Sequence, residues 1–184
     1  MALVNSSMIS LGTQAPEFRL PDGEGKVFDL GDIKGSNGLL VAFICNHCPF
    51  VKHIVGKLEA LHQELLARGI GMVAINSNDV LTHPQDSPDH MLEFASGSGF
   101  TFPYLYDESQ DIARSYDARC TPDFFLFDAE LKLFYRGQLD ASRPGNDVPV
   151  SGEDLLAAAT ALAEHRPFAG VQLPSIGCNI KWRD

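Results

Sequence analysis

The chain has 184 residues, 45% of them hydrophobic, and a formal net charge of −10 at pH 7. A chain of this length can bury about 70% of its unfolded surface, so its core needs neither disulfides nor a metal. Its 14 lysines and arginines form no run, which excludes an obvious site for nucleic acid or for an anionic membrane. We therefore expect one α/β domain over residues 1–184, with no nucleic-acid or membrane partner.

Targeting signals are also missing from the sequence pattern. The first twelve residues hold no basic residue, and nowhere do 18 uncharged apolar residues follow one another. The predicted location is the cytoplasm, although an exported form that had lost its leader would look the same. Four cysteines are too few for a disulfide-stapled domain. In a reducing compartment, a close cysteine pair is expected to be catalytic or metal-binding.

The first predicted elements lie in an N-terminal extension, residues 1–36. Two short strands, Glu17–Leu20 and Lys26–Leu30, flank the turn-rich segment Pro21–Gly25, which predicts a β-hairpin. The unbroken apolar run Leu39–Ile44 then predicts a strand that is buried on both faces of a mostly parallel sheet.

The following segments continue an alternation of helices and strands. Apolar residues at helical spacing from Val51 to Leu65 predict a helix, and Asn78–Asp89 is polar enough to predict a solvated surface loop. A metal site at His83 and His90 is the alternative for this loop. The other predicted elements are the strands Gly71–Asn76, Tyr104–Tyr106, Asp123–Phe127 and Leu133–Arg136, the helices Pro88–Ser96, Gln110–Tyr116 and Glu153–His165, and an irregular tail, Pro167–Asp184, that packs back on the body.

Cys45-Asn46-His47-Cys48 stands where the buried strand gives way to the helix. The carboxyl edge of such a sheet is where active sites gather. Free N–H groups of the first helical turn stabilise a thiolate, so we expect the pKa of Cys45 to lie well below that of a free thiol. With two residues between them, one cysteine can attack a disulfide and the other can resolve the mixed disulfide.

His47 and the remaining cysteines leave alternatives open. A protonated His47 would add positive charge that favours the reduced site, whereas an exposed loop histidine would have little effect. A zinc site would need Cys120 and Cys178 as further ligands, without a second close cysteine pair. We therefore predict no metal and no cofactor.

Four motifs together resemble the thioredoxin-like superfamily. Within it, they are similar to the redoxin group related to alkyl hydroperoxide reductases and thiol-specific antioxidant proteins, and to a bacterial subgroup of thioredoxin family proteins. The motifs are Ala15-Pro16-Glu17-Phe18, Cys45-Asn46-His47-Cys48-Pro49, Thr121-Pro122-Asp123-Phe124-Phe125-Leu126 and Gly177-Cys178-Asn179-Ile180-Lys181-Trp182. The resemblance implies a thioredoxin fold, a central mixed β-sheet flanked by helices, with an N-terminal β-hairpin extension and an irregular C-terminal tail.

The resemblance also implies a substrate groove. Pro122 would be a cis-proline opposite the redox centre, which leaves the backbone of Thr121 open to pair with an extended substrate. Cys120 would lie near Cys45 as a redox partner, as part of the groove or as a buried apolar residue, and Cys178 has either a structural or a resolving role. Thioredoxins carry a buried Asp and a Trp where this chain has Leu39 and Ile44, so the usual buried proton acceptor is missing.

The predicted function is thiol–disulfide exchange with a protein or small-molecule disulfide, through Cys45, Cys48 and His47. The electron donor and the direction of flow stay open. A thiol peroxidase is the first alternative. With Cys48 as its peroxidatic cysteine it would lack the usual Thr and Pro, because Cys45 and Val41 stand there, and it would need Arg119 or Arg136. A redox-responsive binding module is the second alternative.

Overall fold

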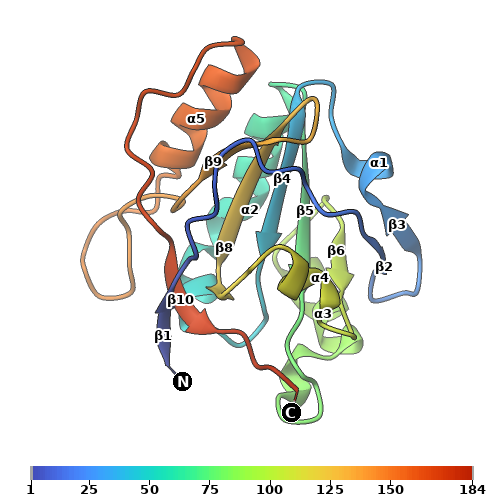
Figure 1. Ribbon diagram of the computed structural model, residues 1–184. Helices are drawn as coiled ribbons and strands as arrows, with labels where there is room; N and C mark the ends of the chain where they lie inside the picture. Colours follow the sequence, from blue (N-terminus) through green and yellow to red (C-terminus); the bar gives the residue numbers. More distant parts are fainter. Residues whose placement is uncertain (1, 184) are drawn as a thin grey trace.

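The computed structural model describes residues 2–183, and its centre is a five-stranded mixed sheet with the strand order β6-β5-β4-β8-β9 (Figure 1). β4, β5 and β6 run parallel, β8 is antiparallel to β4, and β9 is antiparallel to β8, so that only β8 runs against the other four strands. The bounds are Gly38–Phe43 for β4, Ile70–Asn76 for β5, Tyr104–Tyr106 for β6, Asp123–Asp128 for β8 and Leu133–Arg136 for β9. The predicted mixed sheet is confirmed.

The central strands separate two hydrophobic layers, because successive side chains of a strand point to opposite faces. Leu40 and Ala42 of β4 face one layer, which includes α2 (Pro49–Leu66) and α5 (Glu153–Ala163), whereas Leu39 and Val41 face the other. That second layer includes residues of α1 (Leu30–Ile33) and α4 (Asp111–Ser115). Every residue of β4 and β5 is buried, as their apolar runs predict.

The N-terminal extension contains the predicted hairpin, formed by β2 (Arg19–Pro21) and β3 (Val27–Asp29). Asp22 closes its turn, since its carboxylate accepts hydrogen bonds from the backbone N–H groups of Glu24 and Lys26. The helix α2 begins two residues before its apolar pattern, at Pro49, where a proline lacks only an N–H that would have no helical partner.

The prediction that the tail is irregular is wrong for four residues. β10 (Ile176–Asn179) lies between β1 (Leu3–Asn5) and β7 (Cys120–Thr121) in a separate three-stranded sheet, and β1 and β10 lie side by side in Figure 1. The tail does pack back on the body, as predicted. Its strand depends on pairing with two distant segments, and a four-residue segment with two small residues carries no strand pattern of its own.

The solvated loop predicted at Asn78–Asp89 is also corrected. Asn78, Asp79 and Asp86 are buried, and residues Pro84–Asp86 form a short 3-10 helix, η1, before α3 (Pro88–Gly97). This loop leaves the carboxyl end of β5, beside the end of β4, so it folds over the segment that follows β4. Within residues 2–183, no helix is both long and apolar enough to cross a membrane.

Candidate redox site

Cys45 and Cys48 lie at the predicted junction of strand and helix. Cys45 comes two residues after β4, and Cys48 is the N-cap residue of α2, with Pro49 as the first helical residue. Both side chains are buried, and within residues 2–183 no disulfide joins any of the four cysteines. The sheet edge therefore holds two thiols at the amino end of the longest helix described.

Cys48 is the centre of a compact group of polar atoms. Its Sγ lies 2.9 Å from Sγ of Cys178 and 3.1 Å from the carbonyl oxygen of Thr121. Sγ of Cys45 lies 3.4 Å from the hydroxyl oxygen of Thr121. The structure thus brings the cysteine pair together with Thr121 and Cys178, which lie far from it in the sequence.

The two thiols of the motif have opposite pKa shifts. A hydrogen bond from the Cys45 thiol is the main reason that the pKa of Cys48 falls to about 4, and hydrogen bonds from Cys178 and from the backbone of Val51 add to it. The same bond to Cys48, together with burial and the charge of Asp86, raises the pKa of Cys45. The expectation of a lowered pKa for Cys45 is therefore wrong: the lowered pKa belongs to Cys48, at the helix N-terminus.

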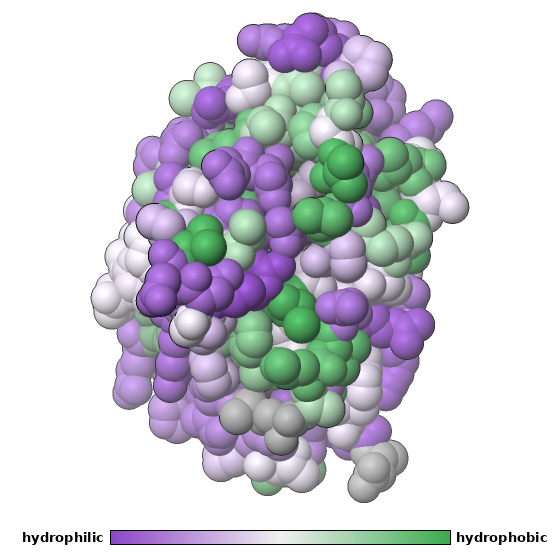
Figure 2. All heavy atoms as spheres, turned by 90° about the vertical axis from the view of Figure 1, so that its left-hand side faces the viewer, coloured by the Kyte–Doolittle hydropathy of each residue, from purple (hydrophilic) through white to green (hydrophobic). Residues whose placement is uncertain are grey.

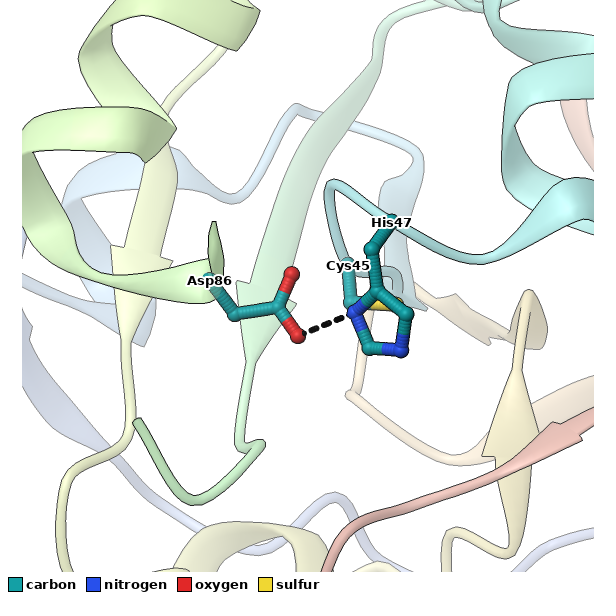
Figure 3. Close-up of side chains that lie close together, drawn as sticks. All are labelled: Cys45, His47 and Asp86. Atoms are coloured by element: carbon teal, nitrogen blue, oxygen red, sulfur yellow. Dashed lines mark hydrogen bonds and ion pairs between the residues drawn. The ribbon is translucent and has the colours of Figure 1, made fainter. Parts of the chain in front are cut away.

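His47 is held by a buried carboxylate. Its Nδ1 lies 2.6 Å from Oδ2 of Asp86, and in Figure 3 the imidazole is drawn in front of the sulfur of Cys45, with Asp86 to one side. The ring also stacks on His83 at a centroid distance of 5.1 Å. Only 13% of the His47 side chain is exposed, so the alternative of an exposed loop histidine is wrong.

Asp86 has three hydrogen-bond donors at its carboxylate, all at normal distances. These are Nδ1 of His47 at 2.6 Å, the backbone N–H of Asn46 at 2.9 Å and Nδ2 of Asn78 at 2.8 Å. Burial acts to raise the pKa of Asp86, but the bonds from His47 and Asn78 outweigh it, and the pKa is lowered on balance. A charged carboxylate therefore stands beside the redox pair.

The sequence reasoning missed Asp86. With Leu39 in place of the usual acid, it concluded that the usual buried proton acceptor is missing, and the structure places another buried carboxylate at the site, from the loop after β5. The parallel pairing of β4 with β5 was the available signal, because the loops after parallel strands meet at one sheet edge. The Asp in such a loop was therefore a candidate neighbour of Cys45.

Metal ligands come close together at one place. Among the residues that the structure describes, Cys45, His47 and Asp86 are the one group of three whose ligand atoms lie within 4.8 Å of one another. A bound ion would compete there with the hydrogen bond between His47 and Asp86. The alternative metal site at His83 and His90 does not belong to this group. Nδ1 of His90 forms a hydrogen bond with Oγ of Ser87 instead.

Cys120 does not join the thiol group. Its Sγ lies 3.5 Å from the carbonyl oxygen of Pro122, and burial raises its pKa far above that of a free thiol. Burial also raises the pKa of Cys178, to about 12, with the neighbouring Cys48 as the second cause. A zinc site that used all four cysteines does not match this geometry.

The peptide bond between Thr121 and Pro122 is cis, as the resemblance implied. The accompanying expectation, that the backbone of Thr121 is open to a substrate, is wrong in this structure. Thr121 in β7 is the register partner of Cys178 in β10, so the chain's own tail occupies that edge.

One known protein family matches most of the chain. The model of the AhpC/TSA family matches residues 11–136, a stretch that includes the cysteine pair and the cis-proline. The chain belongs to the AhpC/TSA family. The matched stretch ends before β10, so the strand that carries Cys178 lies outside it.

Individual proteins of known sequence or structure are also similar to this AhpC/TSA family member. A structure of an uncharacterized conserved protein from Geobacillus kaustophilus is 52% identical, covers 100% of this chain and 97% of its own, and has a TM-score of 0.97. "Thiol-disulfide oxidoreductase ResA" of Bacillus subtilis is 28% identical over 68% of this chain, which spans 65% of that relative. The thioredoxin domain of a Bacteroides vulgatus thiol-disulfide oxidoreductase covers 71% of this chain and 91% of its own, at 19% identity and a TM-score of 0.58. The thioredoxin fold is confirmed.

The two arginines considered for peroxide chemistry lie elsewhere. Arg119 is half exposed and pairs with Asp117, whereas Arg136 is buried, bonds to Asp123 and stacks over Phe125 at 3.8 Å. The hydrogen bonds and ion pairs described for residues 2–183 join neither arginine to Cys45 or Cys48. Neither arginine therefore contacts the cysteine pair among the described interactions.

Proposed function

We propose that the protein is a thiol–disulfide oxidoreductase that uses Cys45 and Cys48 to exchange electrons with disulfide-bearing substrates. The observation that carries the proposal is the hydrogen-bonded pair of thiols at the N-terminus of α2, beside the cis-proline Pro122. The relative named as a thiol-disulfide oxidoreductase supports it.

The proposed cycle begins with Cys45 as a thiol and Cys48 as a thiolate, so that the pair holds one proton. The Cys45 proton passes to the Cys48 thiolate, to which it is already hydrogen-bonded, and Cys45 attacks the substrate disulfide. One substrate thiolate leaves, and Cys48 then attacks Sγ of Cys45 in the mixed disulfide and gives its proton to the second substrate sulfur. The substrate is reduced by two electrons, and Cys45 and Cys48 become a disulfide.

His47 has a positioning role in this proposal. A protonated imidazole beside Cys45 would stabilise the sulfur while it is negative, and the bond to Asp86 fixes the ring in that place. Hydrogen bonds from Tyr104 to Asn46 and from Asn46 to the backbone of Gln85 hold the two-residue spacer against η1. Both residues of the spacer are thus held by hydrogen bonds.

A hollow next to the cysteine pair is the proposed place for groups that flank the substrate disulfide. It is shallow, and its lining includes Phe50, His53, Pro122, Phe124 and Ile176. Figure 2 shows hydrophobic side chains gathered on the face that carries α5 and β10. Such a surface suits the apolar neighbours of a cysteine in a protein or a small disulfide.

Insulin reduction with dithiothreitol as the electron source tests the proposed function. We expect activity in the wild type, none in Cys45→Ser, and full activity in the matched control Cys120→Ser, because Cys120 lies outside the thiol group. Cys48→Ser should accumulate mixed disulfides at Cys45. Full activity of Cys45→Ser would refute the assignment.

The proposed location is the cytoplasm, where a close thiol pair would stay reduced between turnovers. Alkylation of the thiols in intact cells, followed by mass spectrometry of the trapped protein, tests it. A predominantly oxidised pair in growing cells would contradict a reducing compartment.

A further inference from the structure

Strand β10 presents a cysteine to the redox pair. Cys178 is the register partner of Thr121, the residue before the cis-proline, and its Sγ lies 2.9 Å from Sγ of Cys48. A substrate strand paired with Thr121 would bring its own cysteine to this edge. The tail thus occupies the position of a paired substrate strand, and its Cys178 thiol lies beside the redox pair, where a substrate cysteine would react.

The close approach of β10 is built into its backbone. A Cβ atom at Gly177 would lie 2.0 Å from the carbonyl oxygen of Thr121 and 3.2 Å from Cδ of Pro122, so that only glycine fits there. On its other edge β10 pairs with β1, where Leu3 is the partner of Cys178. Pairing on both sides fixes Cys178 against Cys48.

We infer that Cys178 is a third redox-active thiol, which attacks the Cys45–Cys48 disulfide and forms a new disulfide with Cys48. The inference rests on the proposed function, which forms that disulfide. Sγ of Cys178 attacks Sγ of Cys48, the Cys48–Cys178 bond forms, the Cys45–Cys48 bond breaks, and the proton of Cys178 ends on Cys45. Two electrons move from Cys178 to Cys45, so no further oxidant is needed.

The geometry favours this exchange over any that involves Cys120. Cys48 is in hydrogen-bond contact with both Cys45 and Cys178, so that it lies between its two possible partners. A disulfide requires the sulfur atoms of Cys48 and Cys178 to close from 2.9 Å to about 2.05 Å, which is a small movement. Cys120 is directed to the carbonyl of Pro122 instead.

The exchange would give Cys45 back as a thiol while the oxidising equivalent is stored inside the protein. It would also fasten the C-terminal tail to α2 through a covalent bond. The oxidised protein would therefore exist in two isomers, one with a reactive Cys45 thiol and one without.

Disulfide mapping of the full-length Cys45→Ser variant tests the inference. This variant keeps Cys48, Cys120 and Cys178, and it is treated with one equivalent of the thiol oxidant diamide, then alkylated and mapped by mass spectrometry. We expect two of the three thiols to be lost and Cys48 to be linked to Cys178. A variant that keeps all three thiols, or that links Cys48 to Cys120, would overturn the inference.

Two double variants serve as matched controls. Cys45→Ser with Cys120→Ser should form the same internal disulfide, whereas Cys45→Ser with Cys178→Ser should keep both remaining thiols. In the wild type oxidised by insulin, a part of the protein should carry the Cys48–Cys178 bond, and Cys178→Ser should abolish that species.

The results separate the inference from the proposed function. If the wild type reduces insulin and Cys45→Ser keeps its three thiols, the inference fails and the oxidoreductase assignment stands. If the wild type reduces no disulfide while Cys45→Ser forms the Cys48–Cys178 bond, the oxidoreductase assignment fails, and with it the exchange from Cys45.

Discussion

Nδ1 of His47 lies 2.6 Å from Oδ2 of Asp86, which joins the spacer of the cysteine pair to the loop after β5. The carboxylate is fully buried and meets three donors, two from the spacer and one from Asn78. A buried charge is tolerated when its hydrogen bonds are satisfied. Asp86 therefore belongs to the support of the redox site.

Asp86→Asn should destabilise the reduced protein by about 1–3 kcal/mol. The amide offers N–H donors where the carboxylate had only acceptors, so at least one donor of the spacer or of Asn78 loses its partner. Urea unfolding followed by far-ultraviolet circular dichroism measures the difference in the free energy of unfolding.

The control for this change is Asp147→Asn. Asp147 is exposed in a loop, and its φ of 57° is in the left-handed region that asparagine also adopts. We expect an effect within about 0.5 kcal/mol for this substitution. If both variants lost the same free energy of unfolding, the hydrogen bonds of Asp86 would not contribute specifically to stability.

The sequence predicted correctly those elements that depend on a pattern in neighbouring residues. The apolar runs of β4 and β5 and the helical spacing of α2 are visible in consecutive residues, and so is the position of Cys45 and Cys48 between them. The contacts of Asp86 and Cys178 depend on how distant segments meet. Neither the burial of the loop after β5 nor the pairing of β10 with β7 follows from a local pattern.

The titration of the reduced site should reflect the lowered pKa of Cys48. Its thiolate, stabilised by hydrogen bonds from Cys45 and Cys178, should persist at neutral pH and be lost only as the pH falls through about 4. The ultraviolet absorbance of the thiolate, measured on reduced against oxidised protein, follows this directly.

Two variants assign that titration. Cys48→Ser should remove the absorbance change near pH 4, and Cys120→Ser should leave it in place, because the pKa of Cys120 is raised. A change that survives in Cys48→Ser but disappears in Cys45→Ser would place the thiolate on Cys45 instead.

The buried ion pair of Arg136 and Asp123 should matter for stability. Asp123 follows the cis-proline and also accepts a hydrogen bond from Ser6 at 2.7 Å. Arg136→Met leaves this carboxylate buried without its cation, which costs about 3–5 kcal/mol. Thermal and urea unfolding measure the loss.

Arg119→Met is the matched control, because Arg119 forms an exposed ion pair with Asp117. It should change the stability by at most about 1 kcal/mol. Adding Asp123→Asn to Arg136→Met should recover part of the loss, since the unpaired charge is then gone. If Arg136→Met matched Arg119→Met, the buried pair would not be a main support of β8.

Hydrogen peroxide should react with the reduced protein no faster than with an unassisted thiolate. Arg119 and Arg136 are engaged with Asp117 and Asp123, so neither stabilises the charge that develops on the peroxide. Stopped-flow measurement against free cysteine thiolate gives the comparison. A fast reaction that requires Cys48 but survives Cys45→Ser would make the protein a thiol peroxidase.

Gly177→Ala should displace β10 without touching a sulfur atom. The added Cβ would lie 2.0 Å from the carbonyl oxygen of Thr121, which is too close for any side chain, so the strand has to move and Cys178 leaves Cys48. We expect faster alkylation of Cys178 by iodoacetamide and a higher pKa of Cys48, because the Cys178 thiol helps to lower that pKa. Gly56→Ala in α2, where a Cβ meets no atom within 4 Å, should change neither property. Equal alkylation rates in the wild type and Gly177→Ala would mean that the glycine does not hold the tail against the redox pair.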